Sequence, residues 1–269
     1  DTNVIIIRNS KFGDNLNGAA FGATFRATDD IQDFLSGIQS KIELTVGESW
    51  SLGSADELKL KRKIETSGIA LKDWDIAIYY GIKTGFNEAF FIDEETRKRL
   101  IAEDPKSAEL IKPLIRGRDV GRYISYWSRT FLLATGFDEN IKKEYPAIYS
   151  HLHDYKDKLE VRTDKGEAWY NLRACAYYDA FEKEKIAWSR LMRIHKKEMR
   201  SFPRFVLLDK GVYTTDSVCI ITGKALHFFI GVLNSRFAEY FFSKNIAILD
   251  NGGMQMRQQY VENIPIPKI

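Results

Sequence analysis

The stretch YYGIKTGFNEAFFID, residues 79–93, places a Lys-Thr pair between two glycines and flanks them with apolar runs. The runs at 75–80 and 89–93 are typical of short strands, so the stretch predicts a hairpin or a strand–loop–strand unit. It does not predict a P-loop, which needs a glycine directly before the lysine and another five residues before that one. Ile82 and Ala77 occupy those two positions. The Lys-Thr pair therefore needs another explanation.

Short elements of both kinds surround this stretch. Apolar spacing and capping signals predict helices at about 28–44, 54–67, 94–104, 105–112, 138–160 (with a break or late start at Pro146) and 223–243. Strands are predicted at 4–7, 123–135, 185–191, 204–208 and 212–221. The helix at 223–243 is apolar on most sides, so we expect it to be buried. Because helices and strands follow one another without a regular β-α-β order, the predicted fold class is α+β.

The composition describes a globular chain of one large or two modest domains. Its 269 residues are 44% hydrophobic and 29% charged, which is enough apolar content for a core. The longest apolar run, at 225–233, is too short to cross a bilayer. Cys175 and Cys219 resemble neither a disulfide framework nor a zinc pattern. We expect a cytoplasmic protein with no membrane contact, and we expect a chain that begins at Asp1 to be an excised fragment or a processed chain.

Positive charge is concentrated in one segment. The net charge is only +3, but residues 189–204, SRLMRIHKKEMRSFPR, carry six basic residues and one acid, Glu198. Such concentration is typical of a surface that binds a polyanion. A solvated loop or helix face is the alternative, and charge alone does not decide between them.

Catalytic signatures are absent from the sequence. No Pro-Pro pair occurs, so the Asn/Asp-Pro-Pro-Tyr motif of amino-methyltransferases is missing, and so is a Gly-Xaa-Ser-Xaa-Gly elbow. A metal nuclease needs carboxylates and a lysine gathered around Mg²⁺, and no convincing cluster of this kind occurs. His151 and His153 lie in a segment that predicts a helix, where side chains two residues apart diverge. We interpret them as surface histidines.

Several stretches, taken in order, carry a family resemblance. They are YYGIKTGFNEAFFID (79–93), LIAEDPKSAELIKPLIRGRDVGRY (100–123), YPAIYSHLHDYKDKLEVR (145–162), GEAWYNLR (166–173), KIAW (185–188), LNSRFAEYFF (233–242) and YVENIPIPKI (260–269). The series resembles the TaqI-like C-terminal specificity domain of adenine-N6 DNA methyltransferases and type IIG restriction–modification enzymes. The resemblance covers residues 48–269. Residues 1–47 resemble the tail of a preceding methyltransferase domain, or a linker.

The resemblance implies a fold and a function. The fold would be a mixed α/β target-recognition domain with short strands, hairpins and a buried C-terminal helix. It would bind double-stranded DNA beside a methyltransferase domain of the same or a partner chain, and read bases while that domain flips out the adenine. S-adenosylmethionine, and possibly Mg²⁺, would belong to the parent protein, so this chain would need no cofactor and catalyse nothing alone. A protein–protein docking scaffold and a self-contained nuclease are the alternatives.

The resemblance also suggests which residues grip DNA around the opening stretch. Gly81 and Gly85 would allow a tight turn close to the duplex. Lys83 and Thr84 suit phosphate contact, and Asn87 suits a phosphate or a base edge. The alternative is a structural hairpin in which Asn87 holds its own turn.

Arginines supply the other candidates. Arg116, Arg118 and Arg122 surround the turn at Gly117, and their forked donors match phosphates or guanine edges. Asp119 is expected to pair with one of them, so at least one should be structural. Further phosphate candidates are Arg162 and Arg173, and the base-reading candidates are Arg190, Arg193, Lys196, Lys197 and Arg200.

Overall fold

The computed structural model describes residues 16–20, 40–44, 55–137, 140–193, 201–249 and 252–268. The chain divides into two compact units, one of Asp1–Gly68 with Pro267–Ile269 and the other of Ile69–Ile266. The first unit contains the antiparallel pair β1 (Leu16–Ala20) and β2 (Ser40–Leu44) and the helix α2 (Ala55–Ser67). The domain boundary predicted between residues 47 and 48 lies outside the described residues and stays a prediction.

The helix predicted at 28–44 is wrong over its last five residues, which form β2. Their sequence SKIEL alternates charged and apolar residues and so also fits the two-residue period of a strand. The pairing partner, β1, lies more than 20 residues earlier and gives no local signal. Residues 28–39, and the strand predicted at 4–7, lie outside the described part of the chain.

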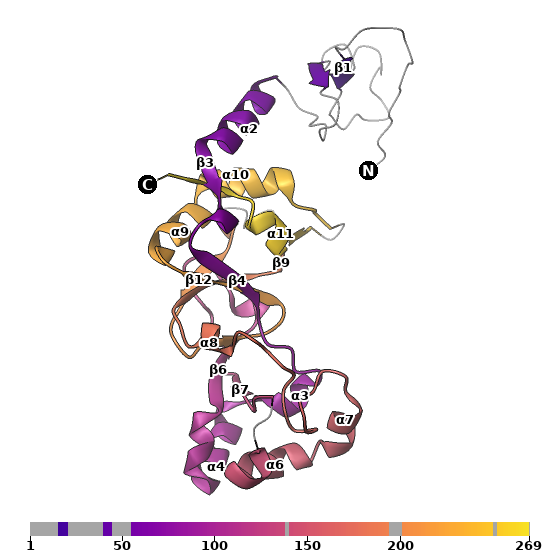
Figure 1. Cartoon of the computed structure of the whole chain (residues 1–269), viewed down its shortest axis with the longest axis vertical. Coiled ribbons are helices and arrows are strands. Elements are labelled where there is room, and N and C mark those ends of the chain that lie inside the picture. The colour runs from indigo at the N-terminus through magenta and orange to yellow at the C-terminus, as the bar shows by residue number, and fades with distance from the viewer. Residues whose placement is uncertain are drawn as a thin grey trace. The chain divides into compact units, whose positions relative to one another are not determined.

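The second unit is built around a four-stranded antiparallel sheet with the order β10-β8-β12-β4. Its strands are β4 (Ile76–Tyr80), β8 (Lys185–Ser189), β10 (Phe205–Leu208) and β12 (Val218–Gly223), all within or overlapping predicted strands. The central strands β8 and β12 are almost fully buried, which explains their continuous apolar sequences. Figure 1 shows β4 and β12 in the middle of this unit, with β6, β7, α4 and α6 toward one end and α9, α10 and α11 toward the other.

A second four-stranded sheet has the order β11-β6-β7-β5, in which β11 and β6 are parallel. Its strands are β5 (Phe91–Ile92), β6 (Ile111–Ile115), β7 (Phe131–Leu133) and β11 (Tyr213–Thr214). The smaller pairs are β9 (Leu191–Arg193) with β13 (Gly253–Gln255) and β3 (Gly68–Ala70) with β14 (Pro265–Pro267). Of the strand predicted at 123–135, only β7 forms.

Of the two alternatives for residues 79–93, the hairpin is wrong, because β4 and β5 belong to different sheets. Strands do form on both sides of the connecting segment, as the strand–loop–strand alternative expects. The Gly-Ile-Lys-Thr-Gly segment instead crosses from one sheet to the other beside residues 214–216. Ile82 forms a parallel bridge with Thr215, and its N–H donates to the Thr214 carbonyl at 2.7 Å. A Cβ at Gly81 would lie 2.1 Å from the Thr215 carbonyl oxygen, so glycine is required by the neighbouring backbone.

Helices cover the two sheets. After α3 (Asn87–Phe90) comes α4 (Glu94–Glu103), where Asp93 accepts the cap bond from Thr96 N at 2.8 Å, as predicted. The predicted break at Pro146 is confirmed, because α5 (Ile141–Glu144) ends before it and α6 (Pro146–His153) begins at it. Next come α7 (Lys156–Val161), α8 (Tyr178–Phe181) and, near the C-terminus, α11 (Gln258–Val261). Within the described ranges, 3₁₀ turns occupy Leu71–Asp73, Pro105–Glu109 and Gly117–Asp119.

The buried C-terminal helix is two helices, not the single one predicted at 223–243. They are α9 (Leu226–Leu233) and α10 (Arg236–Asn245), and Ser235 caps the second by accepting from Ala238 N. The break is fixed by Asn234, which is fully buried. Its side chain accepts from Phe205 N at 3.0 Å and donates to Phe205 O at 2.9 Å, so it pairs with the edge strand β10.

The core is apolar, and among the described residues it also encloses the cationic side chains of Arg162 and Lys185. Trp188 is fully buried, donates from Nε1 to Met256 O at 2.8 Å and packs against Phe205. The Lys185 ammonium donates to three backbone carbonyls, those of Phe181, Lys183 and Asp209. Burial lowers the pKa of Lys185 to about 8. Within the described residues, no helix has the length and apolar character that a membrane span requires.

Candidate nucleic-acid interface

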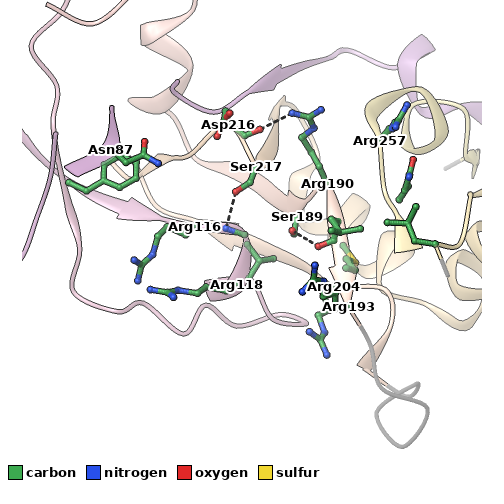
Figure 2. A pocket seen from close by; sticks show the side chains of 17 residues that line it. Asn87, Arg116, Arg118, Ser189, Arg190, Arg193, Arg204, Asp216, Ser217 and Arg257 are labelled. Carbon is green, nitrogen blue, oxygen red and sulfur yellow. Dashed lines mark hydrogen bonds between the residues drawn. The ribbon is translucent and has the colours of Figure 1, made fainter. Parts of the chain in front are cut away.

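An arginine-lined cleft of about 940 Å³ opens beside the first sheet. Figure 2 shows the side chains that surround it, contributed by seven separate stretches of the chain. Six of the residues that line it are arginines and one is an acid, Asp216; the arginines are Arg116, Arg118, Arg190, Arg193, Arg204 and Arg257. Such an excess of one sign creates a strongly positive local potential.

Two neighbouring hollows share residues with this cleft. One, of about 460 Å³, shares Arg190 and Asp216 and adds Lys83 and Arg173; the other, of about 630 Å³, shares Arg118 and Arg204 and adds Arg122. We call the cations that line the three hollows the basic groove: Lys83, Arg116, Arg118, Arg122, Arg173, Arg190, Arg193, Arg204 and Arg257. Asp216 is the only acid among the described residues that line it.

Buried Asp119 organises the arginines of the 116–122 segment. Its Oδ2 accepts from Arg116 N at 2.9 Å and from Arg116 Nε at 3.4 Å, and Arg116 also donates to Ser128 Oγ. The prediction that Asp119 pairs with one of these arginines is confirmed, and Arg116 is the structural member. Arg118 keeps 71% of its side chain exposed, with Nε 4.0 Å from Asp119 Oδ1. Arg118 is therefore the one best able to reach a ligand.

Gly117 allows this segment to lie against β8. A Cβ at Gly117 would be 2.8 Å from Ser189 Oγ, and Gly117 N donates to Ser217 Oγ at 3.3 Å. Arg190 is held on the same side, because its Nη1 donates to the Asp216 carbonyl at 3.1 Å and its guanidinium lies 5.1 Å from the centre of the Tyr80 ring. These contacts bring segments 116–118 and 189–190 to one cleft, as Figure 2 shows.

Lys83 and Arg173 share one carboxylate. Asp164 Oδ2 lies 2.8 Å from Lys83 Nζ, and Asp164 Oδ1 lies 3.1 Å from Arg173 Nη1. The hydrogen bond from Lys83, with the charges of both cations, holds the pKa of the Asp164 carboxyl below its ordinary value. Both cations remain more than half exposed. They can therefore contact an anion without leaving Asp164.

Two predicted contact residues are corrected by their burial. Thr84 is buried and donates from Oγ1 to Asn87 Oδ1 at 2.6 Å. Arg162 is also buried, and its guanidinium donates to the backbone carbonyls of Thr84, Asp164, Trp169 and Asn171. Burial lowers the pKa of Arg162 to about 10, so it stays charged at neutral pH. Neither side chain can reach a phosphate; both hold the loops under the groove.

The remaining predicted residues divide by position. Asn87 accepts from Thr84 Oγ1 and so holds its own turn; it also lines the 940 Å³ cleft, so contact with DNA stays a prediction. Gly85 adopts φ +72°, a backbone conformation that favours glycine. A Cβ at this position would face Asp164 and Arg162, so the glycine leaves room for these neighbouring side chains. Lys196, Lys197 and Arg200 lie outside the described residues.

Sequence reasoning missed two arginines of the groove. Arg204 belongs to the basic run at 189–204, so charge alone pointed toward it. Arg257 stands isolated in the sequence QMRQQY and gives no signal. Among the described residues, no three His, Cys, Asp or Glu side chains gather in a way that suits a metal ion.

Comparison with known proteins places this arrangement in a family. Residues 112–266, more than half of the chain, match the TaqI-like C-terminal specificity domain. The chain belongs to this family. Its specificity-domain region includes eight cations of the groove, from Arg116 to Arg257, whereas Lys83 and Asn87 precede it.

Individual relatives agree with this assignment. The type II methyltransferase M.MjaIV of Methanocaldococcus jannaschii is 28% identical over 209 residues, which are 72% of this chain and 65% of the relative. The chain thus spans less than two thirds of that relative's length. Two solved structures share the fold: the type IIL restriction-modification enzyme MmeI in complex with DNA (TM-score 0.53, 14% identity) and the type IIG restriction endonuclease BpuSI (TM-score 0.51, 15% identity). The matches cover 71% and 79% of this chain and 25% of each enzyme, and they confirm the α+β fold class.

Proposed function

We propose that this specificity domain recognises a sequence in double-stranded DNA on behalf of a methyltransferase or restriction–modification enzyme that modifies adenine at N6. The observation that carries the proposal is the basic groove, where nine cations and one acid line three connected hollows in a member of a specificity-domain family. Duplex DNA is a polyanion whose phosphates follow one another along a groove of this kind. The domain would act in the cytoplasm beside a methyltransferase domain of the same or a partner chain.

The chemistry of the parent protein would lie outside this domain. S-adenosylmethionine is the methyl donor that a methyltransferase requires, but its sulfonium and amino groups are cationic. A cleft lined by six arginines does not fit such a group, and for the same reason it does not fit Mg²⁺. We therefore assign no residue of the groove to a cofactor, and propose that the domain binds DNA without catalysing a reaction.

Binding to a pool of random duplexes at two salt concentrations tests the proposal. If about four phosphates are neutralised, a fourfold rise in salt should weaken binding roughly 100-fold. Sequencing the bound duplexes should reveal an enriched motif. Binding that is indifferent to salt would instead favour a docking scaffold for a protein partner, and Mg²⁺-dependent cleavage by the purified chain would favour a nuclease.

Charge-matched variants locate the interface. Arg118→Ala and Arg190→Ala each remove one groove cation. Each should reduce the slope of log affinity against log salt concentration by about one, the value of one phosphate contact. Arg99→Ala removes the same charge from α4, where Arg99 is half-exposed and pairs with Glu103 outside the groove. If Arg99→Ala weakened binding as much as the groove variants, the groove would not be the interface.

A further inference from the structure

The turn that follows Arg118 exposes an unusual number of large apolar side chains. Tyr123 and Tyr126 are 54% and 66% exposed, and the neighbouring Ile124 and Trp127 are also exposed. We call residues 120–127 the aromatic turn. Contiguous apolar surface of this kind usually marks a binding site rather than a solvated loop. The sequence predicts a strand here, and a strand does not account for this exposure.

Backbone hydrogen bonds hold the aromatic turn. Val120 forms an antiparallel bridge with Ser125, and Gly121 N donates to Ile124 O at 2.9 Å. The ends are fixed by Tyr126 N, which donates to the carbonyl of buried Asp119 at 2.7 Å. A Cβ at Gly121 would lie 2.6 Å from the Tyr126 ring, so glycine leaves room for that ring to fold over the turn. The turn is thus shaped without burial of its aromatic side chains.

The aromatic turn is also hydrogen-bonded to Phe205 and to Asn234, which lies between α9 and α10. Tyr123 N donates to Phe205 O at 2.9 Å, and this same carbonyl accepts from the Asn234 side chain. Arg122 donates from Nη2 to the Asn234 carbonyl, and its guanidinium lies 5.8 Å from the centre of the Tyr123 ring. Asn234 therefore supports the turn from beneath, through Phe205 and Arg122.

Tyr123 occupies a backbone conformation that favours glycine. Its φ is +65°, in the left-handed region that bulky residues rarely adopt. Strain of this kind persists where the surroundings impose it, and it gathers at ligand-binding sites. A glycine would fit the backbone better, so the tyrosine carries a conformational cost. This points to a role for the ring itself.

The aromatic turn borders the basic groove. Tyr126 lines the 630 Å³ hollow together with Arg118, Arg122 and Arg204. Aromatic rings beside cations can pack against base edges exposed in a groove of the duplex while the cations hold the phosphates. An apolar protein partner would have to desolvate these guanidinium groups without offering them an anion.

From this juxtaposition, we propose that the aromatic turn is a base-contacting element, in which Tyr123 and Tyr126 touch bases of the bound duplex. Trp127 has a supporting role, because its Nε1 donates to Thr130 O at 3.1 Å and its ring packs on Phe131. The inference rests on the proposed function and deepens it. It assigns apolar base contact to the turn and leaves phosphate contact to the arginines.

Two substitutions separate base contact from phosphate contact. Tyr126→Ala removes one ring, and Tyr123→Gly removes the other while relieving its backbone strain. Each should weaken binding to the motif enriched by the unchanged chain about tenfold, the loss expected when contact with one base pair is lost. Because no charge changes, the salt dependence should stay the same, whereas Arg118→Ala should reduce it. The duplexes recovered from the random pool should also show a less defined motif.

Controls distinguish this result from misfolding. The unfolding midpoint of Tyr123→Gly should equal or exceed that of the unchanged chain, because glycine accepts the positive φ. Phe137→Ala removes an exposed aromatic ring that lies outside the groove and should leave affinity and motif unchanged. Tyr126→Phe keeps the ring and should keep most of the affinity.

Each outcome is decisive. If the unchanged chain binds duplexes but the two tyrosine variants keep its affinity and its motif, the aromatic turn does not contact bases and this inference alone fails. If the tyrosine variants lower the salt dependence as Arg118→Ala does, the turn acts on phosphates and the inference is again wrong. If the unchanged chain binds no duplex at low salt, the proposed function and the inference fail together.

Discussion

Replacing Arg162 by alanine should destabilise the fold and affect DNA binding only through that loss. Arg162 is buried, and its guanidinium donates to the carbonyls of Thr84, Asp164, Trp169 and Asn171. It also lies 4.6 Å from the centre of the Phe90 ring. One side chain therefore joins the 83–87 segment to the 164–171 segment.

The structure sets the size of the effect. Four carbonyls lose a charged donor, and each such hydrogen bond contributes about 1.5–3 kcal/mol net, but the contributions are not additive. Removing the buried charge also removes its desolvation cost, which offsets part of the loss. We expect the free energy of unfolding to fall by about 3–5 kcal/mol, the range measured when one partner of a buried charged network is removed. If the free energy of unfolding falls by about 2–3 kcal/mol for each mole per litre of urea, the urea concentration at the unfolding midpoint should drop by about 1–2 M.

Urea unfolding followed by tryptophan fluorescence measures this shift, and Arg173→Ala is the matched control. Arg173 is exposed and pairs with Asp164 at the rim, so its loss should change stability by less than about 0.5 kcal/mol. Its loss should, however, weaken duplex binding. The opposite pattern, an unchanged midpoint and weaker binding for Arg162→Ala, would refute the assignment of Arg162 to the scaffold and restore it as a phosphate contact.

Three further substitutions test other parts of the structure. Asn234→Ala leaves the buried Phe205 N–H without its acceptor and removes one of two donors to the Phe205 carbonyl, so thermal unfolding should show a loss of about 1–3 kcal/mol; an unchanged melting temperature would contradict this role. Gly81→Ala should cost about 3 kcal/mol, because its Cβ would meet the Thr215 carbonyl, whereas Gly231→Ala, with open space in α9, should add about 0.5–1 kcal/mol. Burial lowers the pKa of His151 below 6.5, so stability should be complete above pH 6.5 and fall as the pH drops through the lowered value. His151→Gln should flatten this pH dependence in denaturant titrations and His153→Gln should not; equal curves for both variants would show that His151 is not responsible.

Local patterns in the sequence predicted much of the fold. The strands at 185–191, 204–208 and 212–221 carry continuous apolar runs, and β8, β10 and β12 form there because a buried strand needs only such a run. The start of α4 at Asp93 and the break at Pro146 were predictable for the same reason. A capping side chain and a proline act on their own immediate backbone.

Features that depend on distant partners were not predictable. The 79–93 stretch reads as a hairpin, but its strands pair with β12 and β7, which lie more than 35 residues away. The break at Asn234 depends on Phe205. His151, predicted as a surface histidine, is half-buried, and its Nε2 lies 3.1 Å from the Ala89 carbonyl. In each case the deciding contact joins residues that no sequence window contains together.

The groove shows the same division between local and distant signals. The sequence identified Arg116, Arg118 and Arg190 as cations, but not which of them is exposed, because that depends on where Asp119 and Asp216 lie. Arg162 and Arg173 look equivalent in sequence, yet one is enclosed by four carbonyls and the other lies at the rim. Arginine content therefore predicts that a groove exists, while burial decides which arginines belong to it.

The way the aromatic turn is held has a consequence for specificity. Its shape depends on backbone N–H and carbonyl groups, on the buried Asp119 and on Asn234, and not on the side chains that it exposes. Residues 123, 124 and 126 can then change without loss of the supporting hydrogen bonds. Asn234 and Asp119 cannot change in this way, because their side chains form hydrogen bonds with backbone groups next to the turn. Asn234 pairs with the N–H and carbonyl of Phe205, and Asp119 accepts from the N–H of Arg116. If the turn contacts bases as proposed, the recognised sequence can change through these exposed positions while the fold and the phosphate contacts stay the same.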